Sequence, residues 1–163
     1  MLALTLDELL AYTEEERGKW RNWLAANPAA MALRLQPEGR FATVAALIDH
    51  IFLVEARHVA RLRGGQVPTA SGIEEGDRDA LFRYAAETRD ALRAFTRTLD
   101  DVEAQRPREF TVQSGTFRMT PRKLLLHIPL HEVRHWAQIA LVARQAGFAP
   151  PGNHDLFYSK AVD

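Results

Sequence analysis

The sequence contains no cysteine, and this absence excludes several kinds of chemistry. Without a thiol, the chain has no disulfide, no cysteine nucleophile and no thiolate ligand for a metal. It also has no excess of charge of one sign, since 21 Lys and Arg residues are balanced by 21 Asp and Glu residues. Such a balance argues against coating of nucleic acid or binding to an anionic membrane surface. We therefore expect neither nucleic acid nor membrane among the partners.

Long apolar runs are missing as well. The sequence has no stretch of about 18 uncharged apolar residues, the length that a transmembrane helix needs. Its acidic start, MLALTLDELLAYTEEERGKW, lacks the basic and apolar regions of a signal peptide. The 163 residues, 47% hydrophobic and 26% charged, have the size and composition of one globular domain. We expect a single cytoplasmic domain over residues 1–163.

Four amphipathic helices are predicted, separated by segments rich in turn residues. Each has an apolar face of helical period, and Thr5 and Glu8 have the spacing of a capping box at the first helix. The expected ranges are Thr5–Ala26, Ala42–Arg63, Asp77–Leu99 and Pro121–Ala146. Four such helices form a four-helix bundle, and connections of about 13 residues or more permit crossover topology.

A short β-hairpin is expected between the third and fourth helices. Residues 108–120 read REFTVQSGTFRMT, in which Phe110 and Val112 alternate with polar residues. Ser114-Gly115 predicts the turn, and the alternation resumes after it. The expected fold class is therefore all-α, a four-helix bundle with crossover connections and one short β-hairpin.

Histidines gather on the fourth helix, in the segment HIPLHEVRH. His131 and His135 are one helical turn apart, and both lie within about 20° of the centre of the apolar stripe. His127 lies on the flank of that stripe, before Pro129, which is expected to kink the helix. Imidazoles in a bundle core are costly unless they form hydrogen bonds or bind a ligand.

The second helix carries two further histidines on its core side, His50 and His58. They are separated by about 12 Å along the helix axis, so they cannot share one metal ion. One of them with His131 and His135 would give three nitrogen ligands and leave a fourth position open, as in an open metal site. Zinc is the first choice, and nickel, iron and copper also bind imidazole. The alternative is a set of hydrogen-bonded core histidines without a metal.

The chain resembles a known family through two segments, LIDHIFLVEARHVARLRG in the second helix and TPRKLLLHIPLHEVRHWAQIA in the fourth. Both are similar to the DinB-like (DinB/YfiT) superfamily, and the resemblance covers nearly the whole chain. Its most specific element is HxxxH followed three residues later by Gln. The resemblance implies a crossover four-helix bundle, often a homodimer, with a divalent metal on three histidines. Carried over by motif, these ligands are His50, His131 and His135.

The resemblance also implies a class of activity. Some relatives transfer low-molecular-weight thiols such as bacillithiol or mycothiol, or isomerise a thiol-conjugated substrate. A metal-dependent thiol transferase acting on a small-molecule substrate is therefore expected, with the sulfur supplied by a cofactor. Many relatives carry Gly after the first histidine of the motif and Arg-Gly before the Gln, where this chain has Glu132 and Trp136-Ala137. The alternative is a non-enzymatic, stress-related dimeric binding protein.

Glu132 raises a third interpretation, because His131 to His135 also spell HExxH. In zincin proteases this Glu is the general base and the two histidines hold zinc. The usual downstream ligand is absent, since HEVRHWAQIAL replaces the extended motif and no Glu follows. Glu132 is thus the one weak catalytic candidate, and a solvated helix charge is its alternative. Arg17 interrupts the apolar face of the first helix. It is expected to extend its guanidinium group to the surface or to pair with a Glu at the core edge, and the alternative is contact with a substrate carboxylate.

Overall fold

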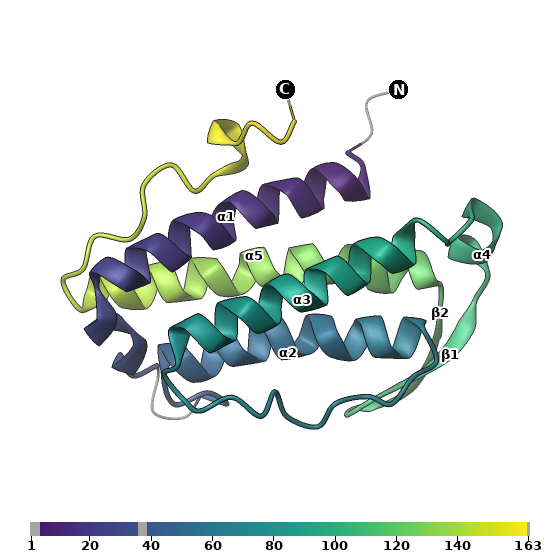
Figure 1. Ribbon diagram of the computed structural model, residues 1–163, viewed down its shortest axis with the longest axis horizontal. Helices are drawn as coiled ribbons and strands as arrows, with labels where there is room; N and C mark the ends of the chain where they lie inside the picture. Colours follow the sequence, from purple (N-terminus) through teal and green to yellow (C-terminus); the bar gives the residue numbers. More distant parts are fainter. Residues whose placement is uncertain (1–3, 36–38, 163) are drawn as a thin grey trace.

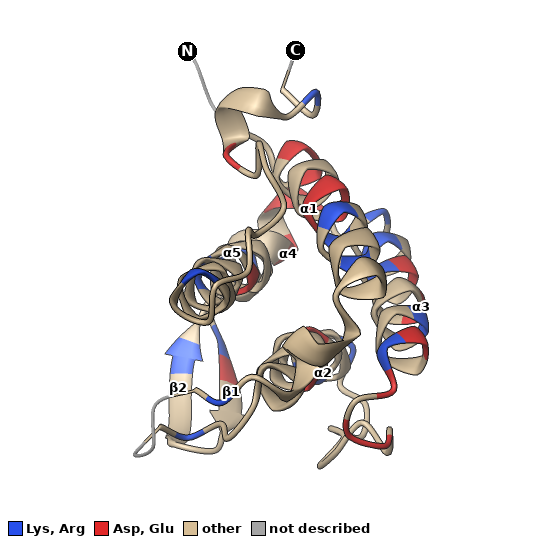
Figure 2. Ribbon diagram, turned by 90° about the vertical axis from the view of Figure 1, so that its left-hand side faces the viewer, with Lys and Arg blue, Asp and Glu red and all other residues tan. Residues whose placement is uncertain are grey.

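Four long helices form a ring around the core of the molecule, in the computed structural model that describes residues 4–35 and 39–162. They are α1 (Leu6–Ala26), α2 (Val44–Leu62), α3 (Arg78–Thr96) and α5 (Pro121–Gln145). Helix α2 packs on α3 and α5, and α1 packs on α5 and α3, so that α1 and α2 lie on opposite sides of the ring (Figure 2). The predicted four-helix bundle is confirmed.

The connections cross the bundle rather than join neighbouring antiparallel helices. The chain passes from α1 to α2 through a short 3-10 helix, η1 (Pro28–Ala32). Helices α2 and α3 run in the same direction, so residues 63–77 return along the length of the bundle (Figure 1). From α3 the chain reaches α5 through a short helix, α4 (Asp101–Gln105), and a hairpin. These are the expected crossover connections.

Side-chain caps set the starts of the long helices. At α1, the Thr5 hydroxyl accepts from the Glu8 amide at 3.2 Å and the Glu8 carboxylate accepts from the Thr5 amide at 2.6 Å, which confirms the capping box. Helix α2 begins at Val44, two residues later than predicted, because the Thr43 hydroxyl caps it by accepting from the Ala46 amide at 3.1 Å.

The predicted end of the third helix is wrong. Helix α3 ends at Thr96, and the amides of Thr98 and Leu99 donate to carbonyls three residues back. Tighter bonds of this kind close a helix rather than extend it. Asp100 then caps the short helix α4, which the sequence pattern did not predict, by accepting from the Glu103 amide at 2.7 Å.

The expected hairpin is present as strands β1 (Arg108–Val112) and β2 (Gly115–Met119). Phe110 pairs with Phe117 and Val112 pairs with Gly115, so the two-residue loop is Gln113-Ser114 rather than the predicted Ser114-Gly115. Gly115 has a φ of 136°, a conformation that side-chain-bearing residues rarely adopt. The hairpin lies beside α2 and α5 (Figure 2).

Two apolar clusters fill the bundle. One centres on Trp20 and Trp136, whose rings stack with centroids 5.2 Å apart, and both tryptophans are buried. The other joins the opposite ends of the helices and the hairpin through Leu10, Val59, Leu62, Leu92, Phe110, Leu124, Leu125 and Ile128. None of the described helices is long and apolar enough to cross a membrane.

After α5 the chain folds back over α1 (Figure 1). Tyr12 donates its hydroxyl to the His154 carbonyl at 3.1 Å, and the Trp23 indole donates to the Ala149 carbonyl at 2.5 Å. A single-turn 3-10 helix, η2 (Leu156–Tyr158), follows. The C-terminal segment therefore covers α1, which packs on the other helices with its opposite face.

The two glycines Gly115 and Gly18 should respond in opposite directions to alanine. Gly115→Ala places a side chain at positive φ and should lower the free energy of unfolding by about 1 kcal/mol or more. Gly18 lies exposed within α1 with no atom within 4 Å of an added Cβ, so Gly18→Ala should raise it by about 0.5–1 kcal/mol. Urea unfolding monitored by circular dichroism measures both changes. Equal effects of the two substitutions would contradict the strained hairpin turn.

Candidate metal centre

Three histidines from two helices meet at one point in the bundle. His131 and His135 come from successive turns of α5, and His50 comes from the facing helix α2. The Nε2 atom of His131 lies 3.2 Å from Nε2 of His50 and 3.0 Å from Nε2 of His135. One ligand nitrogen from each residue lies within 4.8 Å of the others. The structure therefore brings together the three histidines that the family resemblance selected.

The separations suit a shared metal ion. Zinc binds imidazole nitrogen at about 2.0–2.1 Å, and tetrahedral geometry then places two such nitrogens about 3.3 Å apart. The two Nε2 separations of 3.0 and 3.2 Å are close to that value. Among the residues that the structure describes, these three make the group of side chains that could hold a metal.

The three imidazoles are held in the neutral form, which is the form that binds metal. Burial, together with neighbouring His135 and His50, lowers the pKa of His131 to about 2. Burial and His135 also lower the pKa of His50 to about 4. Burial lowers the pKa of His135 as well. No positive charge on these imidazoles therefore has to be lost before a metal ion binds near neutral pH.

A second contact orients His135. Its Nδ1 atom lies 2.6 Å from Oε1 of Gln138, one turn further along α5. Since an amide oxygen only accepts, Nδ1 carries the proton and Nε2 keeps its lone pair. The Phe41 ring lies beside the trio, with its centroid 4.4 Å from that of His50 and 6.4 Å from that of His135. Gln138 and Phe41 thus fix the ring orientation and cover the trio.

The remaining histidines are not part of the trio. The ring centroid of His127 lies 5.3 Å from that of His58 and 5.3 Å from that of His131. His127 and His58 therefore adjoin the trio on one side without converging on its common point. His154 lies on the C-terminal segment, where its Nδ1 is 3.9 Å from a Glu16 oxygen.

Glu132, the acidic residue of the HExxH motif, is only 1% exposed, so its interpretation as a solvated charge is wrong. Its Oε1 accepts from Arg17 Nε at 2.7 Å and from the Trp136 indole at 3.1 Å. Its Oε2 accepts from Arg17 Nη2 at 2.8 Å and from Arg89 Nη2 at 3.0 Å. A zincin base must accept a proton from a bound water. Both oxygens of Glu132 are already occupied by N–H donors, which counts against the hydrolase interpretation.

These contacts belong to a buried charge network of Arg17, Glu55, Arg89 and Glu132, one residue from each long helix. Glu55 accepts from Arg89 Nε at 2.9 Å and also pairs with Arg17. All four residues are at most 4% exposed. Two positive and two negative charges therefore balance inside the bundle, and the predicted pairing of Arg17 with a Glu is confirmed.

The two arginines favour the ionised form of Glu55 despite its burial. Burial alone would raise the pKa of Glu55, but Arg17 and Arg89 outweigh this effect and hold it below its ordinary value. Neutral groups complete the hydrogen bonds, since Arg89 also donates to the Leu10 carbonyl at 2.9 Å and to the Thr13 hydroxyl at 3.0 Å. The sequence pattern did not predict Glu55 or Arg89 as members of such a network.

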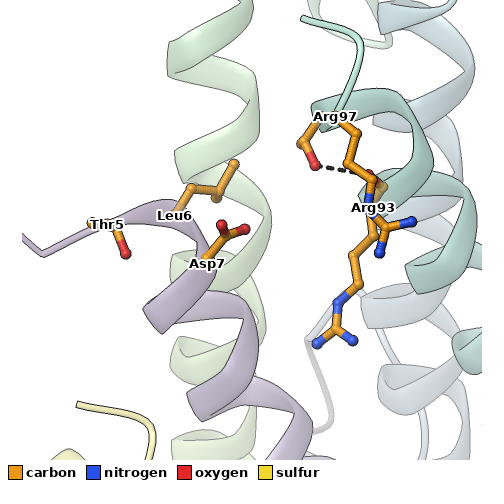
Figure 3. A pocket seen from close by; sticks show the side chains of 6 residues that line it. Thr5, Leu6, Asp7, Arg93 and Arg97 are labelled. Atoms are coloured by element: carbon orange, nitrogen blue, oxygen red, sulfur yellow. Dashed lines mark hydrogen bonds between the residues drawn. The ribbon is translucent and has the colours of Figure 1, made fainter. Parts of the chain in front are cut away.

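A separate cavity of about 480 Å³ lies between the start of α1 and the end of α3 (Figure 3). Asp7 on α1 faces it, with Arg93 on α3 and Arg97 directly after that helix. None of the six histidines lines it, and its charged groups extend from helix ends. Asp7 is the one described side chain in its lining of a type that binds metal, so the histidine trio is the stronger functional candidate.

Removing the charge of Glu132 should destabilise the fold strongly. Glu132→Gln leaves two buried arginines with one carboxylate, and loss of one partner of a buried ion pair costs about 3–5 kcal/mol. Glu87→Gln on the exposed face of α3 is the matched control and should change stability by less than about 0.5 kcal/mol. Urea unfolding measures both. A Glu132→Gln protein as stable as its parent would contradict the role given to the network.

The chain matches the model of the DinB family over residues 1–161. A comparison with curated proteins finds no match. The match includes both helices that carry the trio, and the mainly helical crossover bundle agrees with it. The family resemblance seen in the sequence is thus confirmed, and the chain belongs to the DinB family.

Proposed function

We propose that the protein binds one divalent metal ion through His50, His131 and His135 and uses it to activate a low-molecular-weight thiol. The observation that supports this most directly is the convergence of one ring nitrogen from each of the three histidines within 4.8 Å. Three protein nitrogens leave one tetrahedral position for a ligand, as in catalytic zinc sites. Zinc is the first choice of ion, and nickel, iron and copper share its preference for imidazole.

The reaction class is the one that the family resemblance implies, and the residues around the trio are compatible with it. A bound divalent ion supplies a Lewis acid that lowers the pKa of a thiol or water ligand. The chain contains no cysteine, so a reacting sulfur belongs to a cofactor. In the overall reaction the thiol loses its proton, its sulfur bonds to an electrophilic carbon, and the leaving group departs with the electron pair.

The chain's own residues would bind the metal ion and shield its site. The trio presents neutral ring nitrogens, Gln138 fixes the tautomer of His135, and Phe41 covers one side of the site. Glu132 takes no part in proton transfer, because its oxygens are engaged by Arg17, Arg89 and Trp136. Its function is to hold α5 in register with the other helices. The expected homodimer remains a prediction from the sequence resemblance.

Metal content is the first test of this proposal. Purified protein, analysed by plasma mass spectrometry, should carry about one divalent ion per chain, and single alanine variants of His50, His131 or His135 should lose it. His127→Ala is the matched control, since His127 adjoins His131 without joining the common point. Protein that takes up neither zinc nor nickel on loading would contradict the metal site.

Thiol transfer is tested separately with the loaded protein. Incubation with a panel of small thiols and an electrophile such as a chloronitrobenzene should give thioether product, followed by absorbance. With the His131→Ala protein the rate of thioether formation should fall to background, because this variant cannot hold the ion. Loaded protein that neither turns over nor binds any thiol would favour the non-enzymatic binding protein instead.

A further inference from the structure

A cavity of about 230 Å³ adjoins the trio on the side of the hairpin, with His50 and His131 in its wall. Three arginines, Arg40, Arg57 and Arg61, also line it, and among the described lining residues, which further include His58, His127, Val54, Val112 and Gln113, there is no Asp or Glu. Sites for drug-sized ligands span about 300–1,000 Å³, so this volume suits one small group of a ligand. The cavity is therefore a strongly basic recess next to the candidate metal position.

The arginines share a helix face with a metal-ligand candidate. On α2, Arg57 and Arg61 follow His50 by seven and eleven residues, which places each arginine within about 20° of His50 around the helix. The two arginines are one turn apart and contribute to the same cavity wall. A ligand that enters along this face meets both guanidinium groups on its way to His50.

Neutral groups hold these guanidinium groups in place. Arg57 Nε donates to the Pro68 carbonyl at 2.9 Å, and Nη2 donates to the Thr69 carbonyl. Arg61 Nε donates to the Thr111 carbonyl of the hairpin at 2.7 Å. Carbonyl oxygens fix the position of a guanidinium group but do not neutralise its charge. The remaining N–H groups are pre-oriented donors.

The described hydrogen-bond partners of the three arginines are neutral. Arg40 Nη2 donates to Gln113 Oε1 at 2.8 Å, again a neutral partner. Within residues 4–35 and 39–162, no ion pair includes Arg40, Arg57 or Arg61. Burial lowers the pKa of Arg61, and repulsion from the charge of nearby Arg57 lowers it further. An anion placed between them would relieve that repulsion.

We propose that Arg57 and Arg61, with Arg40 at the rim, bind a carboxylate of the ligand whose thiol reaches the position beside His50 and His131. Guanidinium groups bind carboxylates through two parallel hydrogen bonds, which fixes orientation as well as charge. The part of this inference that concerns the thiol rests on the proposed function. The part that concerns the carboxylate rests on the arginines alone. It assigns the substrate class as small acidic thiols.

The other side of His50 differs in charge. A second cavity of about 310 Å³ there shares Arg40 and Arg57 but is also lined by Asp49, Glu74 and Glu75. Its carboxylates would repel a second acid. The acidic end of the ligand therefore belongs on the hairpin side, and the less charged part of the substrate on the side of the second cavity.

A matched pair of thiols tests the assignment. Zinc-loaded protein is titrated calorimetrically with 3-mercaptopropionate, which is anionic, and with 2-mercaptoethanol, which is neutral. The parent protein should bind the acid about tenfold more tightly or better, the effect of one charged hydrogen-bond pair. Arg57→Gln and Arg61→Gln should each remove most of this preference and leave the affinity for the neutral thiol unchanged. Arg63→Gln, an exposed position at the end of α2 outside the cavity, should keep the preference.

Two further measurements separate the causes of failure. Metal content is determined for every variant, and Arg61→Lys, which keeps the charge but not the paired hydrogen bonds, should retain part of the preference. If the parent takes up no metal, the proposed function fails, and the anion site is then read from the arginine Nε–H NMR signals on adding 3-mercaptopropionate to the metal-free protein. Unmoved Arg57 and Arg61 signals, or a preference that survives both Gln substitutions, would overturn the inference.

Discussion

Four charged side chains that meet inside the bundle, Arg17, Glu55, Arg89 and Glu132, set the positions of the helices that carry the histidines. Glu132 is the sequence neighbour of His131, and Glu55 lies on α2 five residues after His50. A shift of either helix along its axis would separate a carboxylate from both arginines and leave buried charges unpaired. The network therefore fixes the relative register of α2 and α5, on which the convergence of the three Nε2 atoms depends.

The same arrangement divides the basic residues of the molecule into two classes. Arg17 and Arg89 are neutralised by carboxylates and serve the fold. Arg57 and Arg61 donate to backbone carbonyls, which do not neutralise them, and both line the cavity beside His50 and His131. Because the two classes are built from the same side chain, burial and counter-charge, rather than residue type, distinguish the structural arginines from those available to a ligand.

Much of this organisation can be predicted from the sequence where the signal is local. The capping box of Thr5 and Glu8, the hairpin and the facing pair His131 and His135 depend on residues a few positions apart, and all three are present. The choice of His50 over His58 depended on the family resemblance, because both fall on the core side of α2. Helix α4 was missed because a five-residue helix has no hydrophobic period to detect.

The charge network could not be predicted, although a signal exists. Glu55, Arg89 and Glu132 each follow an apolar stripe residue by eight positions, about 80° around the helix, at the edge where a charge can face either water or core. Whether such a charge faces water or the core depends on partners that lie far away in the sequence. The HExxH match drew attention to Glu132 as a catalytic group, whereas its surroundings give it a structural role.

The ligand candidates are all imidazole nitrogens in a chain without a single thiol. Thiolate sites lose their metal when peroxide or disulfide exchange oxidises the sulfur, because sulfenic acids and disulfides are poor ligands. Imidazole has no equivalent oxidation ladder under the same conditions. A trio of histidines therefore keeps its ligand chemistry in an oxidised cell, and any thiol that the protein handles can be consumed and replaced without damage to the site that binds it.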